Sequence, residues 1–318
     1  MEDVYVPDVE LNSLYKMPRI GFGTWLIKPD EVCNVIKSAI RCGYRHIDCG
    51  FIYGNQLEIG KALKELFDEN VVKRDELFIT SKVWNTFHSY KRALKNIDMI
   101  LDELGLDYLD LCLIHWPMGY KEGEELFPKV DEKILLSDID FTETWAALEE
   151  AVSKEKVRSI GLSNFNTKQI EKIVRNCRIR PAALQTEIHV YFQQNDLISF
   201  CKNYGIQVIA SCPLASSKEN PFRKSDYPSV FDDPIIKEIA EELGKTNAQV
   251  ALHYLIQKGL IVIPKSTNEE RMKENIKIIR FMLTDEQFVK MNRLDTGKRI
   301  IHLKSSCHSP RYPWKLNE

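Results

Sequence analysis

Polar residues lie at the ends of three short apolar runs, at positions where a hydrophobic core would not hold them. Asp48, Lys82 and His115 each end such a run, and Tyr53 follows the first of them in a short loop. Together, residues of these types could catalyse the reduction of a carbonyl group. Because tyrosine has a pKa of about 10, it donates a proton poorly at neutral pH unless a nearby lysine lowers that pKa. An aspartate would keep the lysine charged and positioned, and a neutral histidine would orient the carbonyl oxygen.

Each of these residues also has an ordinary structural explanation. Asp48 could cap the next helix, Lys82 could reach solvent, and His115 could be a histidine of the core. Three such residues at equivalent strand ends are harder to explain by coincidence than any one of them. Trp25 and Trp116 would supply apolar walls that exclude water and contact a substrate.

The elements that would position these residues alternate along the whole chain. Eight short apolar runs are predicted to be strands, and amphipathic stretches between them are predicted to be helices. This alternation is typical of a (β/α)8 TIM barrel, in which residues at the carboxyl ends of the strands build the active site. The expected strands are residues 19–24, 44–49, 77–83, 108–115, 157–162, 182–188, 207–212 and 260–263. The expected helices are residues 30–42, 56–66, 90–104, 141–153, 167–176, 195–204 and 247–257.

A doubly wound open sheet is the rival architecture. It usually carries the motif GxGxxG after its first strand, whereas the first strand here ends GFGTW at residues 21–25, without the third glycine. The barrel is therefore favoured. Residues 8–18 are predicted to form an N-terminal β-hairpin at the bottom of the barrel, and residues 297–318 a C-terminal loop over the active site.

Composition favours a single globular domain over residues 1–318. Hydrophobic residues make up 44% and charged residues 28%, and the net charge of −2 does not favour nucleic acid or an anionic membrane as a partner. The eight cysteines are scattered, which predicts reduced thiols and no metal site. The first residues lack the apolar core of a signal peptide, and no apolar run approaches membrane-spanning length. A cytoplasmic location is expected.

Motifs along nearly the whole chain give a more specific expectation. They are MPRIGFGTW at 17–25, GYRHID at 43–48, YGN at 53–55, ITSKVW at 79–84, LIHWP at 113–117, VRSIGLSNF at 157–165, LQTEIH at 184–189 and IPKS at 263–266. Any one of them is weak, but their order and spacing are specific. With these motifs the sequence resembles the aldo-keto reductase family, and in particular its aldose/aldehyde reductase branch.

The resemblance implies a monomeric, NADPH-dependent enzyme that reduces an aldehyde or ketone and binds NADPH/NADP+. It assigns Tyr53 as the general acid, Lys82 and Asp48 as the pair that tunes it, and His115 as the residue that orients the carbonyl. The cofactor-binding residues it implies are Thr24, Trp25, Ser163, Asn164, Gln185, Ser211, Leu214, Lys265, Ser266, Thr267, Arg271, Glu274 and Asn275. The substrate-binding residues it implies are Trp25, Trp84 and Trp116.

Within the cofactor set, three groups have distinct expected partners. Ser163, Asn164 and Gln185 align with residues that hold the nicotinamide carboxamide, and Glu274 and Asn275 with residues at the adenine. The 2′-phosphate is assigned to residues 265, 266 and 271. That assignment also makes physical sense, because a lysine, a hydroxyl and an arginine near a helix N-terminus bind phosphate well.

Three residues depart from the family pattern. Ser211 stands where a tyrosine usually stacks on the nicotinamide, Ala215 where a glycine is common, and Val190 where a proline is usual. Loss of the aromatic stack should weaken cofactor binding or loosen the orientation of the ring. A second reading therefore stays open, a nucleotide-binding protein with the same fold and little or no turnover. The intact set Asp48, Tyr53, Lys82 and His115 favours the enzyme, and His115 favours an aldehyde or ketone over an enone.

Two further points concern other reactions and the substrate. A metal-dependent hydrolase would need His and Asp ligands at several strand ends, whereas Lys82 occupies one of them. The stretches 119–137 and 297–314 are expected to shape the pocket, with Trp314 on an apolar rim. Neither stretch identifies the substrate.

Overall fold

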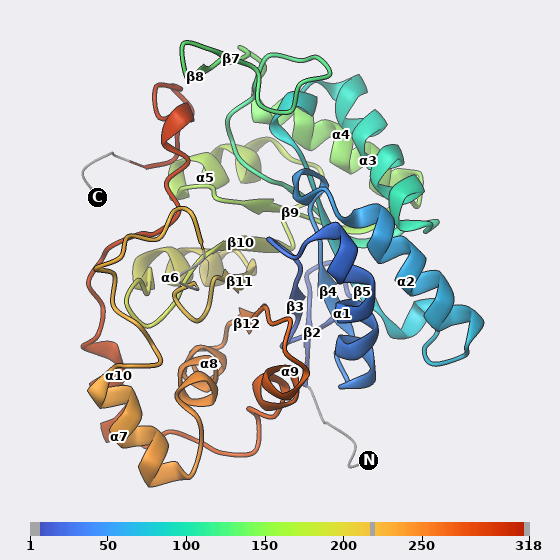
Figure 1. Cartoon of the computed structure of the whole chain (residues 1–318). Helices are drawn as coiled ribbons and strands as arrows, with labels where there is room; N and C mark the ends of the chain where they lie inside the picture. The colour runs from blue at the N-terminus through green and yellow to red at the C-terminus, as the bar shows by residue number, and fades with distance from the viewer. Residues whose placement is uncertain (1–6, 217–219, 315–318) are drawn as a thin grey trace.

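The computed structural model describes residues 7–216 and 220–314. Residues 1–6 lie outside this range, and so do residues 315–318 at the end of the predicted C-terminal loop. The described chain forms a central sheet surrounded by helices (Figure 1). Within the described ranges, no helix combines the length and the apolar character needed to cross a membrane.

Eight parallel strands form the central sheet, and each pairs with the next one around it. The sheet closes on itself, since Ile20 forms a parallel bridge with Val262, and Gly21 N donates to Val262 O at 2.8 Å. This closure confirms the (β/α)8 barrel and excludes the open sheet. Around the barrel the strands are β3 (Phe22–Gly23), β4 (His46–Asp48), β5 (Phe78–Val83), β6 (Leu109–Ile114), β9 (Val157–Ser163), β10 (Ala183–Glu187), β11 (Gln207–Ser211) and β12 (Ile261–Val262).

The strands are apolar on both faces because both faces are covered. In β6, Leu111 and Leu113 pack inside the barrel, whereas Cys112 and Ile114 belong to the larger core between the strands and the helices. This explains why the strands appear in the sequence as continuous apolar runs rather than as alternating ones.

The predicted N-terminal hairpin is confirmed. Strands β1 (Asp8–Glu10) and β2 (Lys16–Pro18) pair antiparallel. Leu11 and Met17 are buried in the same cluster as the residues inside the barrel. The hairpin therefore closes the end of the barrel opposite the active site.

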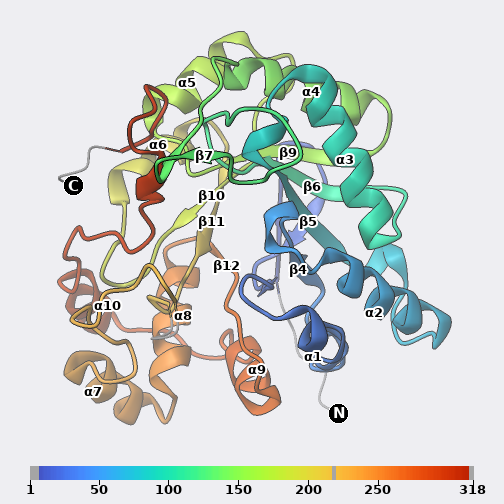
Figure 2. The ribbon, with the colours of Figure 1, turned by 45° about the horizontal axis from the view of Figure 1, so that its top comes forward.

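The helices form a ring around the strands (Figure 2). Seven lie where they are expected: α1 (Pro29–Arg41), α2 (Gln56–Asp68), α3 (Tyr90–Leu104), α4 (Phe141–Ser153), α5 (Thr167–Asn176), α6 (Asn195–Asn203) and α8 (Asn247–Gln257). The sequence analysis did not specify α7 (Pro234–Leu243), α9 (Glu269–Ile276) or α10 (Asp285–Asn292). Each of these three is capped by a side chain, from Asp233, Asn268 and Thr284. Such caps are helix-start signals that the sequence does contain.

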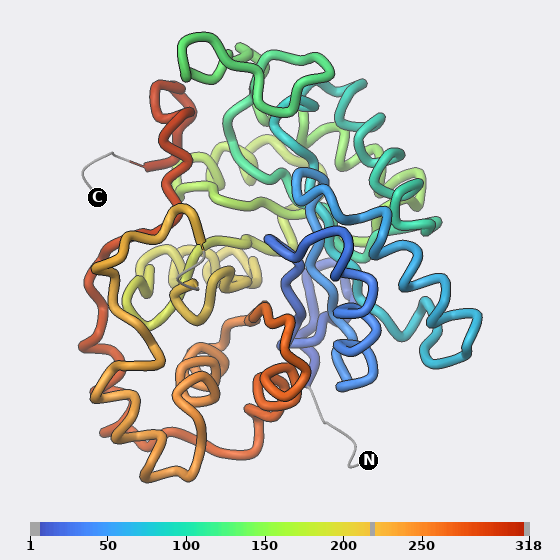
Figure 3. Tube along the Cα trace, viewed as in Figure 1, coloured from blue at the N-terminus to red at the C-terminus, as the bar shows by residue number. Residues whose placement is uncertain are grey.

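Three long segments lie at the carboxyl ends of the strands. The first follows β6 and carries the small hairpin β7 (Lys129–Val130) and β8 (Lys133–Ile134), which was not expected. The second follows β11, at residues 212–216 and 220–233. The third is the tail after α10, which passes the second segment and reaches the hairpin (Figure 3). There Tyr120 Oη and Ser306 Oγ are hydrogen-bonded at 2.5 Å, so the tail is fastened to the loop after β6.

Candidate active site

A cavity of about 940 Å³ opens at the carboxyl ends of the barrel strands. Nearly all of the predicted site residues line it, namely Trp25, Asp48, Tyr53, Trp84, His115, Trp116, Ser163, Asn164, Gln185, Ser211, Leu214, Lys265, Ser266, Thr267, Arg271, Glu274 and Asn275. Thr24 and Lys82 lie behind the wall, and both are fully buried. The hydroxyl of Thr24 donates to the carbonyl oxygen of Asp48 at 2.8 Å, so this side chain supports the site from behind.

A buried ion pair joins two neighbouring strands below the cavity. Lys82 Nζ on β5 lies 2.7 Å from Asp48 Oδ1 on β4, and it also donates to Cys49 O at 2.6 Å. Gln185 Nε2 on β10 donates to Asp48 Oδ2 at 2.6 Å. Both carboxylate oxygens are therefore bonded, which offsets part of the cost of burying the pair. Burial alone would lower the pKa of Lys82, but Asp48 and Tyr53 outweigh it and raise that pKa.

Tyr53 ends the short 3-10 helix η1 (Phe51–Tyr53), directly above this pair. Lys82 Nζ lies 4.9 Å from the centroid of the tyrosine ring. Burial raises the pKa of Tyr53 to about 12, although Lys82 acts in the opposite direction. The phenol is therefore protonated at neutral pH. A Cβ atom at Gly50 would lie 2.9 Å from the ring, so glycine at this position leaves room for it.

His115 follows β6 and faces Tyr53 across the cavity wall. The two ring centroids lie 5.8 Å apart, and the Trp84 ring lies 5.4 Å from the imidazole. Burial, together with the nearby charge of Lys82, holds the pKa of His115 well below its usual range. The imidazole is therefore neutral and can donate a hydrogen bond from one nitrogen. Asn164 Nδ2 donates to the His115 carbonyl oxygen at 3.0 Å and holds this segment in place.

Amide and hydroxyl groups from two further strands lie beside these residues. Ser163 ends β9, and its Oγ accepts a hydrogen bond from Asn164 Nδ2 at 3.1 Å. The backbone of Asn164 has a φ of 61°, a left-handed conformation that asparagine adopts more readily than most residues. Its N–H donates to the carbonyl oxygen of Gln185 at 2.9 Å. This set of donors and acceptors fits a planar carboxamide group.

Cationic groups line the cavity near the start of α9. Lys265 and Ser266 follow β12, and Arg271 lies in the first turn of the helix. Neither Lys265 nor Arg271 has an ion-pair partner within residues 7–216 and 220–314. Asn268 caps α9 by accepting a hydrogen bond from Arg271 N at 3.0 Å. Two cations without a paired acid, a hydroxyl and a helix N-terminus are the donor set that binds a phosphate.

Ser211 lies at the end of β11 and contributes no ring to the cavity wall. On this side the aromatic wall comes from the segment after β11, where Phe222 stacks on Trp25. Their ring centroids lie 6.2 Å apart and the planes differ by 20°. Phe222 was not predicted as a site residue, because an aromatic residue in an irregular loop has no periodic pattern that would place it.

Both stretches that were expected to shape the pocket contribute to its wall, through Phe127 in the loop after β6 and through Ile301 and Leu303 in the tail. Glu187 at the end of β10 also lines the cavity and was not among the predicted site residues. Glu187 had the same signal as Asp48, a charged residue at the end of an apolar strand. Within the described ranges no three His, Cys, Asp or Glu side chains form a group that could hold a metal ion.

Comparison with known proteins places the whole barrel in one family. The model of the Aldo/keto reductase family matches residues 19–296. Aldo-keto reductase family 1 member A1 of Homo sapiens is 42% identical over 307 residues, which covers 96% of this chain and 94% of the relative. Aldo-keto reductase family 4 member C11 of Arabidopsis thaliana is 40% identical over 309 residues, covering 97% and 95%.

A solved structure agrees with these sequence relatives. The aldose reductase from Schistosoma japonicum is 38% identical, with a TM-score of 0.92, and the match covers 98% of this chain and 100% of that one. The family resemblance seen in the motifs is thereby confirmed. This chain belongs to the aldo/keto reductase family and is an oxidoreductase built on the (β/α)8 barrel.

Proposed function

We propose that this protein reduces the carbonyl group of an aldehyde or ketone to an alcohol, with NADPH as the cofactor. The proposal is based mainly on one observation. A protonated tyrosine, Tyr53, lies above the buried pair of Lys82 and Asp48 and beside the neutral His115 in a large cavity. This arrangement can deliver a proton to a carbonyl oxygen and stabilise the charge that remains.

Each residue of this group has a distinct part in the reaction. When bound, NADPH supplies the hydride that the carbonyl carbon receives. Tyr53 donates its phenolic proton to the carbonyl oxygen, which completes the alcohol. The ammonium of Lys82 stabilises the phenolate that is left, and Asp48 holds Lys82 in position. His115 donates a hydrogen bond to the carbonyl oxygen and orients it.

The cofactor assignments follow the chemistry of the cavity wall. Lys265, Ser266 and Arg271 would hold the 2′-phosphate, with Thr267 beside them, and Glu274 and Asn275 would contact the adenine. Ser163, Asn164 and Gln185 would hold the carboxamide. Trp25, Ser211 and Leu214 would line the nicotinamide, and the hydroxyl of Thr24 would act only through Asp48. Trp25, Trp84 and Trp116 would form the apolar wall that receives the substrate.

Some broader predictions belong with this proposal. The substrate would be a small-molecule carbonyl compound, and the protein would act as a cytoplasmic monomer that forms one barrel domain. The family relationship supports the class of substrate. Size-exclusion chromatography with light scattering would test the oligomeric state.

The test measures NADPH oxidation at 340 nm with a panel of aldehydes and ketones. We expect Tyr53→Phe to lower turnover roughly 10²–10⁴-fold, because the general acid is lost, and to leave NADPH binding nearly unchanged. Tyr204→Phe is the matched control, since Tyr204 lies at the end of α6. An equal loss of turnover and of NADPH binding in Tyr53→Phe would contradict the general-acid assignment.

Ser211 supports one alternative function, a nucleotide-binding protein with little or no turnover. Without a ring at the end of β11, the nicotinamide would be held less firmly. Measurable NADPH binding by the unmodified protein, with no turnover across the panel, would favour this alternative.

A further inference from the structure

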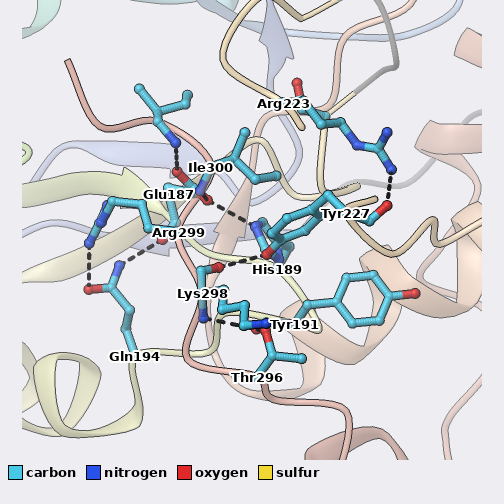
Figure 4. Close-up of polar contacts among 12 residues, drawn as sticks. Glu187, His189, Tyr191, Gln194, Arg223, Tyr227, Thr296, Lys298, Arg299 and Ile300 are labelled. Atoms are coloured by element: carbon cyan, nitrogen blue, oxygen red, sulfur yellow. Dashed lines mark hydrogen bonds and ion pairs between the residues drawn. The ribbon is translucent and has the colours of Figure 1, made fainter. Parts of the chain in front are cut away.

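One buried carboxylate is among the groups that fasten the tail after α10 to the barrel (Figure 4). Glu187 ends β10, and it is 1% exposed. Its Oε1 accepts a hydrogen bond from Ile300 N at 2.7 Å, and its Oε2 accepts one from Ile301 N at 2.8 Å. Two successive backbone amides of the tail therefore share a single carboxylate, which lies 113 residues before the first of them.

Polar neighbours keep this carboxylate charged. His189 Nε2 donates to Glu187 Oε1 at 3.1 Å, which places a proton on that ring nitrogen (Figure 4). Burial alone would raise the pKa of Glu187, but the hydrogen bond from His189 and the charge of Arg299 outweigh it, so that the pKa is lowered. Glu187 is therefore ionised at neutral pH, and its bonds to the tail amides are charge-assisted.

The residue before these amides is held by the same part of the barrel. Arg299 Nη2 donates to Gln194 Oε1 at 3.3 Å, and Gln194 Nε2 donates to the carbonyl oxygen of Glu187 at 2.6 Å. The guanidinium of Arg299 also lies 3.5 Å from the centroid of the Trp314 ring. Three successive tail residues, 299 to 301, are thus bonded to the end of β10 and the start of α6.

The tail is also tied to the segments after β10 and β11. Tyr227 Oη donates to Lys298 O at 2.6 Å, and its ring meets the His189 ring edge-on at 5.9 Å. Thr296 N and Oγ1 both donate to Tyr191 O at 2.9 Å. These contacts fix residues 296–298 of the tail, just before the part that Glu187 holds.

The segment that Glu187 holds forms part of the active-site wall. Ile301 and Leu303 line the cavity, one and three residues after Ile300. Farther along, the Trp314 ring packs edge-on against Trp116, another residue of the wall, with centroids 5.3 Å apart. Any loosening of residues 300 and 301 would therefore move an apolar wall of the cavity and leave the ends of the strands in place.

We infer that Glu187 is a positioning residue that sets the substrate range, by holding Ile301 and Leu303 against the bulky apolar part of a carbonyl substrate. The inference rests on the proposed function, which it deepens. Glu187 takes no part in proton transfer. We expect the reduction of a short aliphatic aldehyde to depend little on Glu187, because such a substrate has no bulky apolar part to rest on this wall. An aldehyde with a fused aromatic ring needs the wall for binding.

The test compares two aldehydes in variants of the full-length protein. Glu187→Gln keeps the size of the side chain, but its amide nitrogen cannot accept a hydrogen bond, so one tail amide loses its partner. The loss of a charge-assisted bond predicts that KM for naphthaldehyde rises roughly 10-fold or more. KM for propanal, kcat for propanal and the Kd for NADPH should stay within about twofold. Glu286→Gln is the matched control, since the Glu286 side chain is 82% exposed.

A different pattern of kinetics would overturn the inference. Equal changes in KM for both aldehydes, or no change for either, would show that Glu187 does not set the substrate range. Ile301→Ala tests the same wall without touching the carboxylate. We expect it to raise KM for naphthaldehyde and to leave KM for propanal unchanged, and an unchanged KM for naphthaldehyde would count against the inference.

Amide hydrogen exchange tests the anchor without any turnover. In Glu187→Gln the amides of residues 299–303 should exchange at least about 10-fold faster, with β5 and β6 unchanged. Unaltered exchange in the tail would overturn the inference. If the unmodified protein reduces neither aldehyde, the proposed function fails, and the exchange result still decides whether Glu187 holds the tail. Should Glu187→Gln not fold, Glu187→Asp replaces it, since the shorter side chain cannot reach both amides.

Discussion

The Tyr53 hydroxyl lies under two opposing electrostatic influences. Burial disfavours the phenolate, whereas the ammonium of Lys82, close below the ring, favours it. Burial has the larger effect, so the pKa of Tyr53 is about 12. The sequence predicted the direction in which Lys82 acts but not the outcome, because the degree of burial depends on the loops around the cavity. The result is a phenol that is protonated at neutral pH.

A substitution at Ser211 tests directly whether an aromatic ring at this position strengthens NADPH binding. Ser211→Tyr should tighten NADPH binding, because a ring at the end of β11 would stack on the nicotinamide. Such pairs contribute about 0.5–1.5 kcal/mol, which corresponds to a Kd roughly 2–10-fold lower. Fluorescence titration with NADPH measures it, and Ser211→Ala, which adds no ring, is the control. A Kd for Ser211→Tyr that equals or exceeds that of the unmodified protein would show that no ring is accommodated there.

Lys265 tests the proposed phosphate site. Lys265→Ala removes a cation that NADH does not need, so KM for NADPH should rise roughly 10-fold or more while KM for NADH changes little. Lys273→Ala, in the helix that follows Lys265, is the control, because the Lys273 ammonium already pairs with Glu269 and Glu270. Steady-state kinetics with both cofactors provide the comparison. Similar losses for NADPH and NADH would place the phosphate elsewhere.

At the scale of elements, α2 and α3 approach each other closely at one glycine. A Cβ atom at Gly60 would lie 2.4 Å from the backbone oxygen of Glu103 and 2.8 Å from the backbone of Leu104. Alanine normally favours a helix over glycine by about 1 kcal/mol. Here the added methyl group meets backbone rather than a flexible side chain, so the two helices would have to move apart.

We therefore expect Gly60→Ala to lower the free energy of unfolding by about 1–3 kcal/mol, the usual cost of overpacking. Urea unfolding followed by circular dichroism measures this value. Lys61→Ala, at the next position of α2 with a side chain 61% exposed, is the control and should have little effect. Gly60→Ala with unchanged or increased stability would show that the helices separate without cost.

At the scale of the whole molecule, buried neutral histidines make stability depend on pH. Burial is the main cause that lowers the pKa of His46 to about 4 and that of His88 to about 3, and it also lowers the pKa of His115. In the unfolded chain these groups titrate near 6.5. Between about pH 4 and pH 6.5 the unfolded state therefore binds more protons, and the free energy of unfolding rises with pH.

This linkage predicts lower stability in mild acid. For His46 alone, the shift corresponds to on the order of 3 kcal/mol, lost progressively as the pH falls from 6.5 to 4. Urea unfolding at pH 7.5 and at pH 5.5 measures the loss. His46→Gln should reduce the difference between the two pH values, whereas His308→Gln, on the partly exposed tail, should not. Equal stability at both pH values would contradict the prediction.

The sequence by itself determined the order of the barrel and many of the residues that line its cavity. Burial on both faces of a strand leaves an apolar run, and a half-buried helix leaves a period of 3.6 residues, so both can be read locally. Asp48, Lys82 and His115 stood out for a related reason, as polar residues that end apolar runs. Helices α7, α9 and α10 were readable in principle from their capping residues.

Only the tertiary structure decided how distant segments meet. Barrel closure joins Ile20 to Val262, and the tail reaches Glu187 across more than a hundred residues. The stacking of Phe222 on Trp25 likewise depends on the path of an irregular loop. Loop conformations leave no period in the sequence, since their contacts are made across the fold and not along the chain. For that reason the strands and the stretches that shape the pocket could be predicted from the sequence, whereas the contacts that build the pocket wall could not.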